Sequence, residues 1–439
     1  MKINAFWFRR DLRLEDNHGL WAALTSGKPV IAIFIFDDHI LESLPEDDAR
    51  VHFIHNRILA IQEQLAQENS YIHVLKGSPQ KCWSEVIGLY DIDTVFFNHD
   101  YEPYALRRDG SIKDQLSKSG IKMQGFKDHL IFEGNEVVKD DGKPYTVFTP
   151  YKNKWMSRLS EGGGKIPTAF KTFPSADFTS NFYKSSTAIY QVPSLKSLGF
   201  TPSKIEFPSS HVMASLIAAY DKTRDFPAIA GTSKLGIHYR FGTISIRQKA
   251  VKALQLNQTY LNELIWRDFY AMILFHFPST IYEAFRKEYD RIEWLNDPTD
   301  FEKWKEGKTG YPLVDAGMRE LHATGYMHNR VRMVVASFLT KHLLIDWRWG
   351  EAYFAEKLLD YDQASNVGGW QWAAGCGTDA APYFRIFNPQ AQAEKFDPEK
   401  KYIKKWVPEV DSLTYSKPLV DHKYARERCL ATYKKALAR

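Results

Sequence analysis

The first 130 residues alternate between short apolar runs and amphipathic stretches. The apolar runs are rich in β-branched and aromatic residues and occupy positions 3–8, 30–36, 71–75 and 94–97. Runs without a polar face are typical of buried parallel strands. Between two of them, apolar residues recur at three- and four-residue steps over 51–65, which predicts a helix with one buried face. This alternation predicts a Rossmann-like parallel α/β domain over residues 1–130.

A segment rich in glycine and proline separates this region from a helical one. Residues 131–204, which include Gly162-Gly163-Gly164, show no sustained periodicity and predict an interdomain linker. From 205 to 439 helical periodicity dominates, so we expect an all-α C-terminal domain. The helical stretches lie at 212–220, 248–254, 261–275, 313–324, 331–344 and 351–359.

Composition narrows the class of protein. The 439 residues are 44% hydrophobic and 25% charged, as in a globular chain, and no apolar run approaches the length of a membrane span. Arg9 and Arg10 interrupt the N-terminus before a secretory leader could form, so we expect a cytoplasmic protein. Cys82, Cys376 and Cys429 lie far apart and predict neither a disulfide framework nor a metal site.

Aromatic content and charge distribution leave two questions open. Aromatic residues make up 14% of the chain, which suits either a large core or a site for planar rings. The last segment, 399–439, has eleven basic and five acidic residues and so carries the whole net positive charge. Such a tail either faces nucleic acid or forms a solvated helix.

Apparent nucleotide and nucleophile motifs fail on inspection. Gly307-Lys308-Thr309 ends like a P-loop, but Glu302 stands where its first glycine is required. The segment 231–236 has one residue too many for a nucleophile elbow. The N-terminal region also has no G-x-G-x-x-G, so it is not an obvious dinucleotide-binding domain.

Two segments of the helical half combine residue types that a core does not need. At 231–235, Thr232 and Ser233 stand at a turn into a helix, which suits a phosphate or an ordinary helix cap. At 263–270, Glu263, Trp266 and Arg267 share one helix face with Tyr270. That face is either a salt-bridged surface or the wall of a pocket.

Two further segments suit a planar ligand. Asn329, Arg332 and Met333 align on a helix face at 325–333. At 359–372, alternating acids and an asparagine precede Gly368-Gly369, where the backbone can be approached closely. Such a segment offers donors and acceptors to the edge of a heterocycle.

These segments together closely resemble the cryptochrome/photolyase family, and within it the class I cyclobutane pyrimidine dimer (deoxyribodipyrimidine) photolyases. The resemblance starts at 6–17, runs through Phe148-Thr149-Pro150-Tyr151, and is densest from Gly307 to Phe387-Asn388-Pro389. It implies an α/β antenna domain, a linker over 131–204 and a helical FAD-binding domain. It also implies a flavoprotein lyase for DNA repair, in which light-excited FADH⁻ donates an electron to a flipped-out dimer.

The resemblance also implies site residues. Those expected at the FAD phosphates and ribose are Tyr220, Thr232, Ser233, Lys234, Leu235 and Gly236, although the family often has serine at the last position. Those expected around the flavin ring are Arg267, Asn329, Arg332, Asp360, Tyr361, Asp362 and Asn366. Those expected at the damaged DNA are Arg224, Glu263, Trp266, Asn329, Arg330, Met333, Trp372 and Arg385. Glu263 and Asn366 are expected to take part in catalysis. Trp370, Trp347 and Trp294 are expected to relay electrons to the flavin.

Other members of the family remain as alternatives. A signalling cryptochrome without repair activity is disfavoured by the intact set around Glu263 and Trp266. A (6-4) photolyase would carry paired histidines where His328 is followed by Asn329, and a single-strand-specific relative would replace Trp372 with tyrosine. The antenna domain is expected to hold methenyltetrahydrofolate, 8-hydroxy-5-deazaflavin, another flavin or nothing. The expected partner is UV-damaged DNA, bound by a monomer without any membrane.

Overall fold

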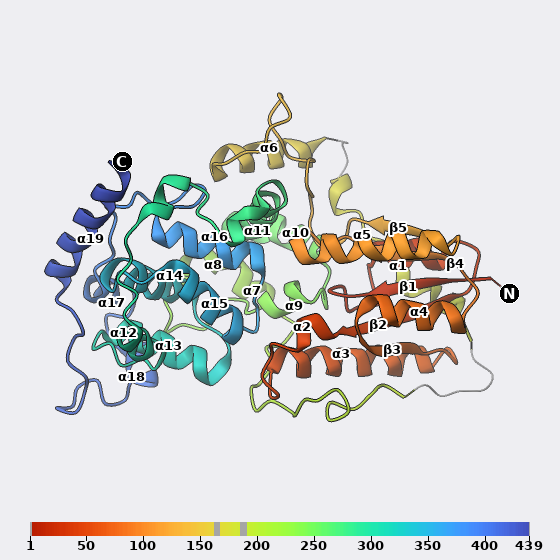
Figure 1. Ribbon diagram of the computed structural model, residues 1–439, viewed down its shortest axis with the longest axis horizontal. Helices are drawn as coiled ribbons and strands as arrows, with labels where there is room; N and C mark the ends of the chain where they lie inside the picture. Colours follow the sequence, from red (N-terminus) through yellow and green to blue (C-terminus); the bar gives the residue numbers. More distant parts are fainter. Residues whose placement is uncertain (1, 162–166, 185–190, 439) are drawn as a thin grey trace. The chain divides into compact units, whose positions relative to one another are not determined.

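The computed structural model describes residues 2–161, 167–184 and 191–438, so Gly162, Gly163 and Gly164 of the expected linker lie outside the described residues. The chain forms two compact units (Figure 1). Unit 1 comprises Met1–Glu136, Trp155–Ser210 and Leu235–Gln255. Unit 2 comprises Val137–Lys154, His211–Lys234 and Leu256–Arg439.

Unit 1 is built on a five-stranded, fully parallel sheet with strand order β3-β2-β1-β4-β5 (Figure 1). The strands are β1 (Ile3–Phe8), β2 (Val30–Asp37), β3 (Ile72–Gly77), β4 (Ile92–Asn98) and β5 (Lys122–Phe126). The four apolar runs in the sequence are therefore confirmed as strands. β5 was not predicted, because its sequence KMQGF has no apolar run and none of its residues is fully buried.

Alternate residues of the strands pack into two separate cores on the two faces of the sheet. Phe6 and Phe8 of β1 join one core with α1 (His18–Leu24) and α3 (Ala49–Ala66). Trp7 joins the other core with α4 (Pro79–Leu89) and α5 (Pro103–Lys118). The remaining helical segments of unit 1 are α2 (Asp38–Leu41), η1 (Thr168–Phe170), η2 (Ser175–Asn181), α9 (Gly236–Arg240) and α10 (Ile246–Leu256). The α/β prediction for this part of the chain is confirmed.

Unit 2 is predominantly helical in its described residues, with one isolated β-bridge between Val138 and Pro144. Its elements are α7 (Ala214–Ala218), α8 (Tyr220–Thr223), α11 (Gln258–His276), η3 (Pro278–Ile281), η4 (Lys287–Arg291), α12 (Pro298–Lys305), α13 (Pro312–Thr324), α14 (Asn329–Ser337), the π-helical turn η5 (Phe338–His342), α15 (Trp347–Lys357), α16 (Gln363–Ala374), α17 (Pro389–Phe396), α18 (Lys401–Trp406) and α19 (His422–Leu437). One large core joins the helices from η4 to α19 around the fully buried Trp304, Trp347 and Trp370.

The expected linker contains a helix that the sequence analysis missed. α6 (Phe148–Ser160) lies inside 131–204, and Tyr151, Trp155 and Leu159 are buried at helical spacing. The surrounding glycines and prolines concealed this four-residue repeat. The units also divide 131–204 between them and place 235–255 in unit 1, so they do not coincide with the predicted boundaries at 130 and 204.

The Gly307-Lys308-Thr309 turn is closed by a carboxylate of the chain itself. Asp315 accepts hydrogen bonds from the backbone nitrogens of Thr309 (2.8 Å) and Gly310 (3.1 Å), and from the Tyr415 hydroxyl (2.6 Å). The donors that would face a phosphate in a P-loop are therefore occupied.

Three further features concern the whole chain. Cys82, Cys376 and Cys429 are free and at most 3% exposed. Burial raises the pKa of their thiols to about 11, 12 and 11, respectively. Among the described helices, none is long and apolar enough to span a membrane.

Candidate active site

One face of α11 carries a half-buried row of polar and aromatic side chains. Asn257 caps the start of the helix by accepting from the Tyr260 amide, and Glu263, Trp266 and Tyr270 follow on one face. The Trp266 ring stacks on Phe148 with centroids 3.7 Å apart and planes within 4°. This pair forms a rigid apolar wall, which a solvent-facing helix would not need.

Glu263 is half-buried and paired with an arginine. The Arg224 guanidinium lies 2.5 Å from its carboxylate and also faces the Tyr220 ring at 5.4 Å. Burial raises the pKa of Glu263, although the charge of Arg224 acts in the opposite direction. The carboxyl therefore stands closer to protonation than an exposed glutamate does.

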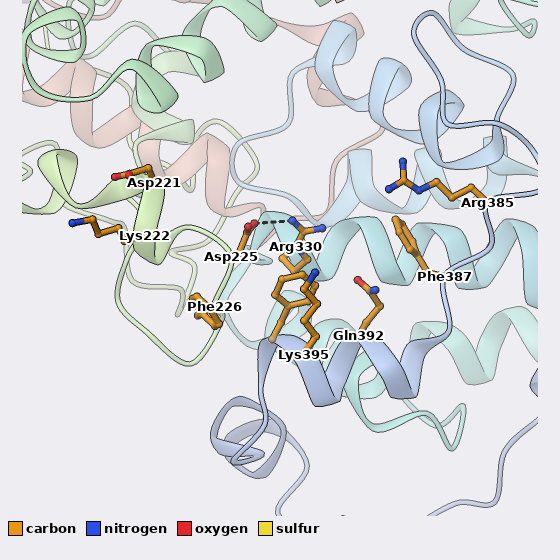
Figure 2. A pocket seen from close by; sticks show the side chains of 10 residues that line it. Asp221, Lys222, Asp225, Phe226, Arg330, Arg385, Phe387, Gln392 and Lys395 are labelled. Carbon is orange, nitrogen blue, oxygen red and sulfur yellow. Dashed lines mark hydrogen bonds and ion pairs between the residues drawn. The ribbon is translucent and has the colours of Figure 1, made fainter.

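A pocket of about 410 Å³ opens beside this pair. Basic side chains of Lys222, Arg330, Arg385 and Lys395 line it, together with acidic and aromatic residues (Figure 2). Asp225 also lines it and lies 2.7 Å from Arg330, and Figure 2 shows these two side chains pointing toward one another. The surplus of cations suits a phosphate backbone.

A second polar cluster involves the start of α14 and the segment before α16. The Arg332 guanidinium contacts both oxygens of Asp360 at 3.0 and 3.1 Å and donates to the Met327 carbonyl at 2.7 Å. Burial opposes its charge, but the contacts with Asp360 outweigh this and raise the pKa of Arg332. The Arg332 guanidinium therefore keeps its charge beside Asp360.

The Asn366 amide is held in one orientation. Its Nδ2 donates to the backbone carbonyl of Glu351 at 3.0 Å and to the side-chain carboxylate of the same residue at 2.8 Å. Both donors are thereby used, and the carbonyl oxygen is left to accept a bond from another group. Burial raises the pKa of Glu351, and the bond from Asn366 partly offsets this.

The same helix has open space at a glycine. Asp362 caps α16 by accepting from the Ser365 amide at 3.1 Å, and a Cβ added at Gly369 would meet no atom within 4 Å. The Arg332–Asp360 salt bridge, an amide oxygen and an unobstructed backbone fit the edge of a flavin ring. The residues present therefore fit FAD.

The expected phosphate turn is divided between the units. In unit 2, Thr232 Oγ1 lies 3.2 Å from the Tyr326 hydroxyl, Ser233 Oγ accepts from Tyr260, and Lys234 Nζ lies 5.0 Å from the Tyr326 ring. Leu235 and Gly236 belong to unit 1, where they begin α9.

The remaining expected residues take up several positions in unit 2. Asn329 is exposed at the first residue of α14, and the Met333 sulfur lies 3.8 Å from Arg330. Trp372 is half-buried with its ring 6.5 Å from that of Phe387, while Arg385 is exposed. Arg267 and Tyr361 are half-buried.

The three expected relay tryptophans belong to one apolar core. Trp370 and Trp347 are 2% exposed, and Trp294 packs against the same cluster at its partly buried edge. Trp370 contacts Phe354 and Trp304 with ring centroids at 5.0 and 6.2 Å. A relay role for these residues stays a prediction.

Sequence reasoning missed several partners of the expected residues. Phe148 was matched only as part of a motif, and Glu351, Tyr326 and Asp225 were given no role. The sequence distance between partners explains this, since Phe148 lies 118 positions from Trp266. The alternating charges in Arg224-Asp225 were the one local signal available.

Comparison with known proteins decides the family. Residues 4–174 match the family model described as DNA photolyase, and residues 260–414 match the one described as the FAD binding domain of DNA photolyase. The deoxyribodipyrimidine photo-lyase of Halobacterium salinarum is 37% identical over 487 residues, covering 99% of each chain. The chain belongs to the DNA photolyase family.

Solved structures of family members are similar over their full length. A class III photolyase from Agrobacterium tumefaciens has a TM-score of 0.86 at 32% identity, covering 100% of this chain and 98% of that one. An archaeal photolyase from Sulfolobus tokodaii with two FAD molecules has a TM-score of 0.83 at 34% identity, covering 99% and 100%.

These comparisons confirm the predicted family, the fold class and the FAD-binding domain. The class I subgroup is not tested by them and stays a prediction, as do the roles of the individual site residues.

Proposed function

We propose that the protein is a light-driven deoxyribodipyrimidine photolyase, a DNA repair lyase that splits cyclobutane pyrimidine dimers. The name of its Halobacterium salinarum relative supports this activity. The observation that carries the proposal is that both expected residue sets share two helices of unit 2. α14 holds Arg332 of the flavin set and Met333 of the lesion set, and α16 holds Asn366 and Trp372.

The lesion residues divide the work of binding. A dimer inside a duplex must be flipped out of the base stack, and the lost stacking and pairing cost roughly a few kcal/mol. The stacked Trp266–Phe148 pair offers a flat wall to the displaced bases. Glu263 offers a carboxyl whose raised pKa favours hydrogen bonding to a pyrimidine carbonyl. Arg330 and Arg385 hold the flanking phosphates.

The flavin residues set the environment of the cofactor. Bound FAD in its reduced form would supply the light-excited electron that opens the cyclobutane ring, and would then recover it. Asn366 Oδ1 would accept a hydrogen bond from a flavin N–H, because both of its own donors are held by Glu351. Arg332 and Asp360, held together at 3.0 Å, would orient the ring edge.

The proposal includes a cytoplasmic monomer that needs no membrane. Light scattering tests the oligomeric state. The antenna chromophore is distinguished by an absorption spectrum of freshly purified protein, which separates a folate, a deazaflavin and a second flavin.

The decisive experiment is repair of defined oligonucleotides under blue light. We expect light-dependent loss of a cyclobutane thymine dimer, no reaction in the dark, and no repair of a (6-4) product. Trp266→Ala is expected to weaken dimer binding by ~1–3 kcal/mol through loss of stacking surface. Tyr282→Ala, which changes a 70% exposed aromatic residue, serves as control and should bind normally. Repair of the (6-4) product alone would contradict the assignment.

A further inference from the structure

Four charged side chains in unit 2 form a row of alternating sign. The Glu263 carboxylate lies 2.5 Å from Arg224 Nη1, and Arg224 Nε lies 4.0 Å from Asp225 Oδ1. The same Asp225 oxygen lies 2.7 Å from Arg330 Nη2. Asp225 therefore stands between two arginines, one of which holds the carboxyl expected at the lesion.

The Arg330 end of the row is built to receive an anion. Its guanidinium lies 4.4 Å from the centre of the Phe396 ring, and its buried Nε has no hydrogen-bond partner among the described residues. It lines the 410 Å³ pocket together with the basic Arg385 and Lys395. A phosphate entering this pocket would meet the Arg330 side chain beside two further cations.

An incoming phosphate would compete with Asp225 for that guanidinium. Arginine binds phosphate in the same forked geometry as carboxylate, so the two anions are alternatives at one cation. Asp225, once displaced from Arg330, has Arg224 as its remaining cation in the row, at 4.0 Å. A closer Arg224–Asp225 contact draws Arg224 away from Glu263.

We propose that Asp225 is a positioning residue that couples phosphate capture at Arg330 to the release of Glu263 from Arg224. The inference rests on the proposed function. It gives the protein a way to expose the Glu263 carboxyl once the DNA backbone is in place. Discrimination between damaged and undamaged DNA then depends partly on a residue that touches neither the dimer nor the flavin.

The test compares dark binding of the FAD-loaded protein to one oligonucleotide with and without a thymine dimer. Asp225→Asn removes the charge and keeps the shape. Undamaged DNA should bind more tightly, since Arg330 no longer has a competing acid. The affinity for dimer-containing DNA divided by the affinity for undamaged DNA should fall roughly three- to five-fold, because Arg224 remains paired with Glu263.

The matched control is Glu394→Gln. Glu394 is exposed on α17 beside Lys395, and it accepts a hydrogen bond from Gln390. Its removal deletes one negative charge from the same neighbourhood, so both affinities should rise together and the ratio should not change. FAD content and melting temperature verify that each variant is folded.

Two further variants make the coupling specific. In a Glu263→Gln background, Asp225→Asn should leave the ratio unchanged, because there is no carboxylate to release. Asp225→Glu retains the charge and should keep the ratio within about two-fold of wild type. Three results would each overturn the inference: an unchanged affinity ratio in Asp225→Asn, an equal fall of the ratio in both backgrounds, or a ratio in Asp225→Glu as low as that in Asp225→Asn.

Failure of the proposed function has a different signature. Equal affinity of the wild-type protein for dimer-containing and undamaged DNA would contradict both the proposed function and this inference. Discrimination by the wild type that persists in Asp225→Asn removes only the inference.

Discussion

Trp266 and Asn366 owe their expected roles to neighbours that are distant in sequence. Phe148 holds one face of the Trp266 ring, and Glu351 consumes both donors of the Asn366 amide. In each case the partner restricts the side chain to one orientation before any ligand arrives. Preorganisation of this kind lowers the entropy lost on binding.

The proposed electron relay is tested at Trp370. Trp370→Phe removes the ring expected nearest the flavin and should slow photoreduction of oxidised FAD severely, since electron hopping falls steeply with distance. Repair by chemically prereduced enzyme should remain nearly normal, because that electron passes directly to the dimer. Transient absorption and a repair assay supply the two measurements.

Trp304→Phe is the control, because Trp304 is equally buried and its ring lies 6.2 Å from that of Trp370. The Trp304→Phe variant loses a similar amount of packing, but Trp304 has no expected relay role. Photoreduction in this variant should therefore stay close to that of the wild type. Loss of prereduced repair in Trp370→Phe with normal photoreduction would reverse our assignment.

Residue types at the site could be predicted from the sequence, whereas their partners could not. Spacing on α11 placed Glu263, Trp266 and Tyr270 on one face, as the structure has them. Spacing within a helix cannot reveal contacts between segments, so Phe148 and Glu351 acquired meaning only in the folded chain.

Close approach between α15 and α16 depends on Gly350. A Cβ added there would lie 2.1 Å from the Trp370 ring. Gly350→Ala should lower the melting temperature, with an overpacking cost of about 1–3 kcal/mol that outweighs the better helix propensity of alanine. Photoreduction should change as well, because Trp370 must move. Normal stability and normal photoreduction would show that the two helices separate freely.

Gly369, on the neighbouring helix, should behave in the opposite way. Nothing lies within 4 Å of a Cβ built there, so Gly369→Ala should leave the FAD-free protein as stable or up to ~1 kcal/mol more stable. FAD affinity should fall, because the methyl group enters the space assigned to the ring. Thermal denaturation and flavin fluorescence titration separate the two effects, and unchanged affinity would move the flavin away from this face.

The π-helical turn η5 carries a buried lysine with a distinct pH signature. Lys341 is 1% exposed, donates to the Tyr383 carbonyl at 3.1 Å, and lies 4.2 Å from the Tyr433 ring centre. Burial lowers its pKa to about 8. Between that value and its unfolded pKa near ~10.4, the unfolded chain binds more protons, so this group makes stability rise with pH.

The measurement compares wild type with Lys341→Met between pH 8 and pH 10. The contribution changes by about 2 kcal/mol across this window, so the melting temperature of the wild type should gain roughly 2–3 °C relative to the variant. Parallel profiles for the two proteins would mean that Lys341 titrates as an exposed lysine.

Helices and strands whose apolar residues follow a clear pattern in the sequence were predictable, and those without such a pattern were not. β1, β2 and β4 are buried nearly throughout, and their sequences read as apolar runs. α6 repeats its buried residues every three or four positions, but the surrounding glycines and prolines gave the opposite signal.

At the scale of the whole molecule, DNA affinity should depend on salt. Basic side chains around the 410 Å³ pocket replace counterions on phosphates, so the dissociation constant should rise steeply with ionic strength. Arg385→Gln should reduce the slope of log affinity against log salt by about one. The exposed Arg291, which donates to the Glu288 carbonyl, provides the control variant Arg291→Gln with an unchanged slope.

The basic C-terminal segment contributes less free charge than its composition indicates. Asp411 contacts Lys400 at 3.3 Å and Lys404 at 3.0 Å, and Lys435 lies 2.7 Å from Glu293. Counting charges along the sequence could not reveal this pairing. The order of the α/β and helical regions, in contrast, followed directly from periodicity.

The burial of all three cysteines makes the protein convenient for site-specific labelling. Maleimides react with exposed thiolates, and Cys82, Cys376 and Cys429 are neither exposed nor ionised near neutral pH. A cysteine introduced at exposed Lys222 or Glu394 would therefore be the fast-reacting thiol of the folded chain. A fluorophore placed there could report arrival and departure of single DNA molecules without first removing the native cysteines.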